Sequence, residues 1–61
     1  MKYEIRNQFG NVPYIDGLRD EIIHSHNNGR TSIWWNGDSI DILGHKVVDG
    51  TMVINIYIHG I

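Results

Sequence analysis

The clearest pattern of hydrophobic and polar positions is the alternation along residues 51–59, TMVINIYIH. Successive residues of a strand point to opposite faces of a sheet, so this alternation predicts a β-strand with two different faces. One face is uniformly apolar and is expected in the core; its members are Met52, Ile54, Ile56 and Ile58. The other face mixes polar, apolar and aromatic groups, which suits solvent or an interface. Its members are Thr51, Val53, Asn55, Tyr57 and His59.

Two dipeptides upstream of apolar runs predict tight hairpin turns. Asn36-Gly37 and Asp49-Gly50 both suit a two-residue type I′ turn, whose central residues need positive φ. The two turns predict a three-stranded antiparallel meander with strands over about 31–35, 38–48 and 51–59.

The registers set by these turns disagree by one residue in the middle strand. Ile42 and Val47 are both expected on the core face, yet an odd number of steps separates them. One extra residue must therefore be absorbed between them. A β-bulge at Leu43-Gly44 is the natural solution, because glycine accepts unusual backbone conformations.

The first third of the chain predicts one strand, a turn and one helix. Residues 2–8 alternate as a short strand, and the glycine and proline of residues 9–14 predict a turn. Asp16 is expected at the N-cap of a helix over about 17–26, whose apolar positions Leu18, Ile22 and Ile23 follow helical spacing. Residues 27–29, Asn-Asn-Gly, supply the left-handed C-terminal conformation.

Together these elements predict a single two-layer α+β domain over residues 1–61. The helix is expected to cover one face of the meander, and the N-terminal strand to join an edge whose identity the pattern does not determine. The covered face is expected to carry Ile33, Ile40, Ile42, Val47, Met52, Ile54, Ile56 and Ile58.

Composition narrows the classes of function. The chain has 61 residues and no cysteine, so disulfides and thiolate metal sites are excluded. Five Lys/Arg against seven Asp/Glu give a formal charge of -2, which disfavours nucleic acid as a partner. No apolar run reaches the roughly 20 residues that span a bilayer, and no signal peptide is evident. We therefore expect a cytoplasmic protein without a membrane partner.

The face turned away from the helix is the candidate binding surface. The predicted registers place on it Trp34, Ser39, Asp41, Val53, Tyr57 and His59. Trp and Tyr dominate binding hot spots, and a domain this small gains from burying more surface in a homodimer. The pattern leaves open whether such a dimer uses this face or joins two sheets edge to edge through unpaired strands. The alternative is that these residues are cross-strand pairs that only stabilise the sheet.

Catalytic and metal chemistry find little support. Ser39, Asp41 and His59 invite comparison with a catalytic triad, but a flat sheet supplies no oxyanion hole. His24 and His26 are two residues apart, which points them about 200° apart on a helix, whereas helical metal ligands lie three or four apart. His45 is expected on the core side, partly buried and hydrogen-bonded. We predict no catalytic residue, no metal ligand and no cofactor.

In size, lack of cysteine, mild acidity and lack of a catalytic signature, the chain resembles the small accessory proteins of bacteriophages and mobile elements that bind and block a host protein, including inhibitors of antiviral defence. The resemblance rests on general character and transfers no site residue. It implies a non-catalytic inhibitor that acts by occlusion in the host cytoplasm, whereas the expected homodimer rests on the small core and the aromatic face. The alternative is a nucleic-acid-binding module that stacks bases on Trp34 and Tyr57.

Overall fold

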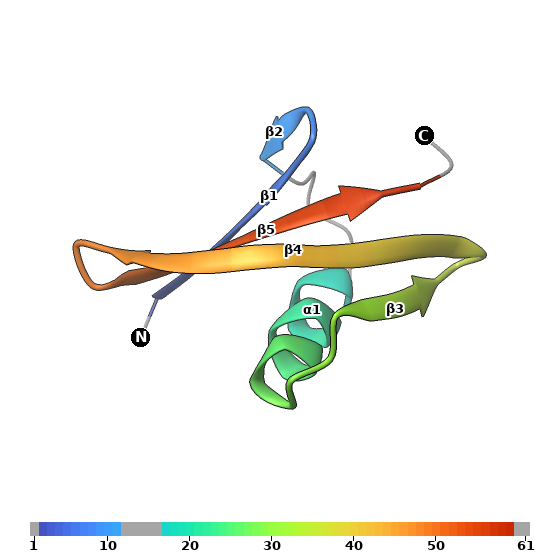
Figure 1. Cartoon of the computed structure of the whole chain (residues 1–61), viewed down its shortest axis with the longest axis horizontal. Helices are drawn as coiled ribbons and strands as arrows, with labels where there is room; N and C mark the ends of the chain where they lie inside the picture. The colour runs from blue at the N-terminus through green and yellow to red at the C-terminus, as the bar shows by residue number, and fades with distance from the viewer. Residues whose placement is uncertain (1, 12–16, 60–61) are drawn as a thin grey trace.

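The computed structural model describes residues 2–11 and 17–59, and shows one helix lying on one face of a mixed five-stranded sheet (Figure 1). This confirms the predicted α+β class. In chain order the elements are β1 (Lys2–Asn7), β2 (Gly10–Asn11), α1 (Leu18–Asn27), β3 (Ser32–Trp35), β4 (Asp38–Val48) and β5 (Thr51–Ile58).

The strands lie side by side in the order β2-β1-β5-β4-β3. β3, β4 and β5 form the predicted antiparallel meander. β1 joins the free side of β5 in parallel, which makes β5 the central strand. β2 is a two-residue strand that the sequence pattern did not predict, and it pairs with the end of β1 within the segment expected only to turn.

Both hairpin turns have the predicted backbone. Asn36 and Asp49 adopt φ of 47° and 49°, and the glycine after each also has positive φ. Ile33 pairs with Ile40 across the first turn, and Val47 pairs with Met52 across the second. The turn chemistry therefore fixes both registers, as a type I′ turn does when its two residues accept positive φ.

The predicted bulge is present in β4. The register with β5 shifts between Ile42 and Gly44, so that Leu43 is the extra residue. The position was predicted correctly, but the reason given for it was wrong in part. Positive φ occurs at five other glycines and not at Gly44, so this bulge does not depend on a left-handed backbone.

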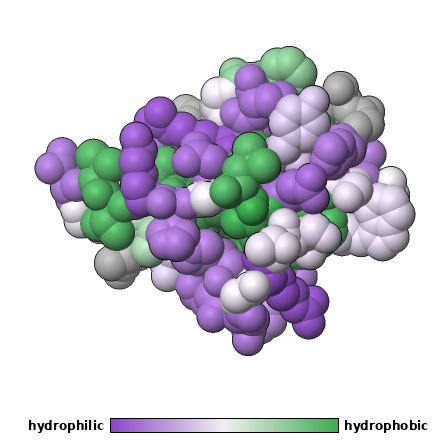
Figure 2. All heavy atoms as spheres, in the orientation of Figure 1, coloured by the Kyte–Doolittle hydropathy of each residue, from purple (hydrophilic) through white to green (hydrophobic). Residues whose placement is uncertain are grey.

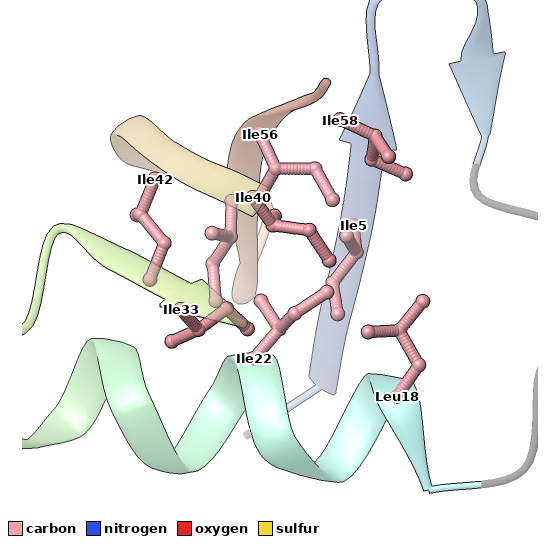
Figure 3. Close-up of a cluster of buried hydrophobic side chains, with 9 residues drawn as sticks. Ile5, Leu18, Ile22, Ile33, Ile40, Ile42, Ile56 and Ile58 are labelled. Atoms are coloured by element: carbon pink, nitrogen blue, oxygen red, sulfur yellow. The ribbon is translucent and has the colours of Figure 1, made fainter. Parts of the chain in front are cut away.

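The core lies between α1 and the sheet (Figure 3). Leu18 and Ile22 of α1 point at a layer of sheet isoleucines, and Ile22 and Ile54 have no exposed surface. A ten-residue helix is too short to be stable alone, so this packing holds it in place. The buried sheet members are Ile5, Ile33, Ile40, Ile42, Ile54, Ile56 and Ile58.

Two residues predicted for the core side lie on that face, as expected, but are exposed. Val47 is 57% exposed, because the β4–β5 hairpin extends past the end of the helix that should cover it (Figure 1). His45, expected to be partly buried, is exposed and packs its ring edge-on against His26 at 4.6 Å between centroids. Apolar alternation identifies a face, but it cannot say how far along that face the covering helix reaches.

The helix ends agree in part with prediction. Gly29 adopts the left-handed conformation after the C-terminus with φ 74°, as expected. At the other end the N-cap position is occupied by Gly17, with φ 83° and no side-chain hydrogen bond to the helix. The predicted cap, Asp16, lies outside the described residues.

Candidate functional site

The outer face of the sheet, defined here as the face turned away from α1, has no other described element over it (Figure 1). Its aromatic end combines β3, β4 and the end of β5. Trp34 is paired with Ser39, and Asp41 lies between Ser32 and Tyr57. The backbone N–H of His59 donates to the carbonyl of Ser39 over 2.9 Å, which extends the pairing past β5.

Five of the six residues predicted for the binding surface are available there. Trp34 is 72% exposed and Tyr57 is 42% exposed, while Ser39, Asp41 and His59 are half-buried or exposed. Val53 points to the same side but is only 5% exposed. It lies on the central strand, and we attribute its burial to its long-chain neighbours on β1 and β4, so it offers little surface to a partner.

Asp41, Tyr57 and His59 form one cluster. Nε2 of His59 lies 2.8 Å from Oδ2 of Asp41, a hydrogen bond that becomes an ion pair when the histidine is protonated. The rings of Tyr57 and His59 are 4.8 Å apart and tilted by 54°. Because the Asp41 and His59 side chains remain 43% and 51% exposed, water screens this pair and its contribution to stability is small.

The same geometry does not assemble a triad among the described residues. A triad needs its histidine between the acid and a hydroxyl nucleophile, with a donor pocket for the oxyanion. Here His59 bonds Asp41 through one nitrogen, while the bond that connects it to Ser39 runs between backbone atoms. The arrangement offers a hydrogen-bonding surface to a ligand rather than an activated hydroxyl.

The opposite end of the outer face is cationic, which the sequence did not predict. The parallel pairing of β1 with β5 brings Lys2 and Arg6 onto the face that already holds Lys46. These three of the five Lys/Arg residues line a shallow hollow of about 590 Å³, together with Glu4 and Asp49. Arg6 is paired to Glu4 at 3.1 Å, so Lys2 and Lys46 carry most of the free positive charge.

A third surface is the open edge of β4, defined here as residues 43–48. β3 pairs only with residues 38–41 of β4, and the backbone N–H of Ile42 donates one further hydrogen bond to the carbonyl of Thr31. Beyond Ile42, no described strand lies beside β4 on that side. Leu43, Val47 and Val48 are 65%, 57% and 45% exposed. Half of the six large exposed hydrophobic side chains in the described residues are on this edge, and Figure 2 shows apolar groups among polar ones on this side of the molecule.

Across residues 2–11 and 17–59, no group of three or more His, Cys, Asp or Glu side chains is placed to hold a metal ion. His26 and His45 meet in a pair across α1 and β4.

Comparison with known protein families, curated proteins and solved structures finds no match to this chain. Within the described part of the chain, no helix is long and apolar enough to cross a membrane. The functional argument therefore rests on the surfaces themselves.

Proposed function

We propose that this protein is a small non-catalytic protein-binding module that acts as a homodimer and covers a functional surface of a partner protein with its outer face. The observation that carries the proposal is the aromatic end of that face, where Trp34 and Tyr57 are exposed on neighbouring strands of the meander. Exposed aromatic side chains held on strands lose little conformational entropy on binding and form the typical hot spots of protein interfaces.

Polar groups beside the aromatics fit this role. Asp41 and His59 flank Tyr57, and Ser39 lies beside Trp34. An aromatic centre surrounded by groups that can donate or accept hydrogen bonds is the usual composition of a protein-binding patch. The partner we propose is a host protein, in keeping with the resemblance to inhibitors of host defence, and blocking it requires only that the bound sheet excludes its normal ligand.

The test compares three alanine variants as immobilised baits in a bacterial lysate, at low and high salt, with mass spectrometry of the retained proteins. Trp34→Ala and Tyr57→Ala should weaken capture of a stoichiometric partner by about 30-fold or more, which corresponds to a hot-spot loss of about 2 kcal/mol. Phe9→Ala is the matched control, since Phe9 is an aromatic residue of similar exposure, 73%, on the turn after β1. If all three variants retain the partner equally, the aromatic end is not the binding surface.

A nucleic-acid-binding role is the second candidate, and one observation favours it. Lys2, Arg6 and Lys46 share the outer face with Trp34 and Tyr57, so a single strand could follow the cationic hollow and stack on the aromatics. This role requires affinity that falls steeply with salt. Filter binding with single-stranded and duplex probes at two salt concentrations tests it, and binding that is absent or insensitive to salt removes it.

A further inference from the structure

We propose that two copies of this chain associate through the open edge of β4, antiparallel and about a two-fold axis at Val47, to form one continuous ten-stranded sheet. This inference rests on the homodimer of the proposed function and adds to it the surface and the register. The occupant is a second copy because the two ends of the edge are complementary to each other.

The first argument is the backbone. Val48 and Thr51 face each other across a two-residue turn, so their backbone groups point at one another. Since these groups alternate in direction along a strand, those of Val47 and His45 point away from β5, into the open edge. An identical strand running antiparallel can pair with them and complete the ladder.

The second argument is side-chain complementarity. A two-fold axis at Val47 places Val47 opposite itself and Lys46 opposite Val48. Asp49, the first residue of the turn that follows β4, then comes close to the histidine end of the other copy's edge, where His45 packs against His26, and this approach occurs twice. The valine pair at the centre removes the apolar surface that Val47 exposes in the single chain.

The neighbouring register is opposed by charge. The core faces of the two copies lie on the same side of the joined sheet only when the two-fold axis passes through a residue. An axis midway between two residues would turn the core face of one copy outward. An axis at Lys46 would place two lysines directly opposite each other at about 5 Å between Cα atoms, which is unfavourable. Lys46 therefore opposes this neighbouring register.

In this arrangement both helices lie on one side of the joined sheet and both outer faces on the other. The aromatic end of each copy is distant from the axis, because it is built from β3 and the far ends of β4 and β5 (Figure 1). Association through the edge therefore leaves the proposed binding surface free. Because the paired stretch is short, we expect a dissociation constant in the micromolar range.

The chain has no cysteine, so a single introduced cysteine reports the axis directly. Under copper–phenanthroline oxidation, Val47→Cys should form disulfide-linked dimers at least about tenfold faster than Lys46→Cys or Val48→Cys. With the axis at Val47, the Cα atoms of the two Lys46 residues, or of the two Val48 residues, are about 8 Å apart. They are separated by two residue steps along the strand and by one strand spacing across the sheet. That separation is beyond the roughly 7 Å a disulfide can bridge. Fastest linkage at Lys46→Cys would overturn the register.

Sedimentation of the unmodified chain, from micromolar to near-millimolar concentration, tests the association itself. We expect a mass that rises from 7.0 kDa toward twice that value. Val47→Pro should remain at 7.0 kDa, because proline removes the N–H that points into the open edge without touching the bonds to β5. Val47→Lys is a second variant that places a charge at the axis.

A monomer at every concentration, or a dimer that both Val47 variants leave intact, would overturn the proposal. A chain that is monomeric at every concentration would also remove the homodimer from the proposed function. Neither result bears on partner binding through Trp34 and Tyr57, whose test is partner capture, so that part of the proposed function fails or holds separately.

Discussion

Gln8 continues the sheet with its side chain where β1 has ended. Its Nε2 donates to the carbonyl oxygen of Ile58 over 2.7 Å, and its Oε1 accepts from the N–H of Ile58 over 3.1 Å. β1 pairs with β5 only as far as Asn55, so among the described residues only this carboxamide pairs with the backbone of the buried residue Ile58 on that side. Gln8→Met removes both hydrogen bonds while keeping a side chain of similar length.

The expected cost follows from these two bonds. Each partly buried hydrogen bond contributes about 1 kcal/mol net, so Gln8→Met should lower the free energy of unfolding by about 2 kcal/mol. For a domain of this size that loss corresponds to a fall in melting temperature of about 8–16 °C. Gln8→Glu keeps the acceptor but turns a carboxylate oxygen toward the Ile58 carbonyl, so it should cost at least about 1 kcal/mol.

Urea denaturation followed by circular dichroism measures the cost, and amide hydrogen exchange locates it. In Gln8→Met the Ile58 amide should exchange faster, while the amide of Ile54, deep in the central strand, keeps its protection relative to global unfolding. Phe9→Ala, a change at the exposed neighbouring position, serves as the control and should be within about 0.5 kcal/mol of the unmodified chain. If Gln8→Met also stayed within about 0.5 kcal/mol of the unmodified chain, the argument that this carboxamide holds the end of β5 would be refuted.

Three further changes probe the helix start, the core and the outer face. Gly17→Ala should destabilise by about 1–2 kcal/mol in urea denaturation, because Gly17 has φ 83° and an added Cβ would lie 3.1 Å from the Trp35 ring. Ile54→Ala should cost about 2–5 kcal/mol, enough to leave part of the chain unfolded by circular dichroism at 25 °C, since Ile54 is fully buried. Asp41→Asn should change the unfolding free energy by less than about 1 kcal/mol, because its pair with His59 is exposed to water.

Gly17→Ala and Ile54→Ala each have a matched control in the chain. Gly29→Ala shares the positive φ of Gly17 without a neighbour within 4 Å, so it isolates backbone strain from the contact with Trp35. Val47→Ala deletes an exposed aliphatic side chain on the same hairpin as Ile54, and in the monomer it should cost under about 0.5 kcal/mol. If Gly17→Ala and Gly29→Ala proved equal, the ring contact would contribute nothing.

The meander could be predicted because the residues of a tight turn determine how the two strands beside it pair. Asn36-Gly37 and Asp49-Gly50 each specify a two-residue turn, and each turn fixes a register that the structure reproduces. The bulge could be predicted from the sequence alone, because the registers set by the two turns differ by one residue in β4. Period-2 alternation likewise placed Ile40, Ile42 and Ile56 in the core.

What the sequence left open depends on distant contacts. The parallel pairing of β1 with β5 joins segments separated by the whole chain, and no turn specifies it. That pairing decides the composition of the outer face, because it brings Lys2 and Arg6 onto it and places Val53 in the central strand, where it is buried. The sequence also did not predict the open edge of β4. That edge is exposed because β3 and α1 end before they cover it, and the sequence pattern does not specify where they end in space.

The outer face and the open edge together predict a difference between intrinsic affinity and avidity. In the proposed dimer, whose two-fold axis is perpendicular to the sheet, the two aromatic ends would lie on the same side and would hold an immobilised partner at two points. Val47→Pro should therefore bind free partner in solution as tightly as the unmodified chain, yet dissociate at least about tenfold faster from a densely coated surface. Equal dissociation of the two proteins from that surface would mean that the two aromatic ends do not engage together. If Val47→Pro weakened binding equally in solution and on the coated surface, the edge itself would contact the partner.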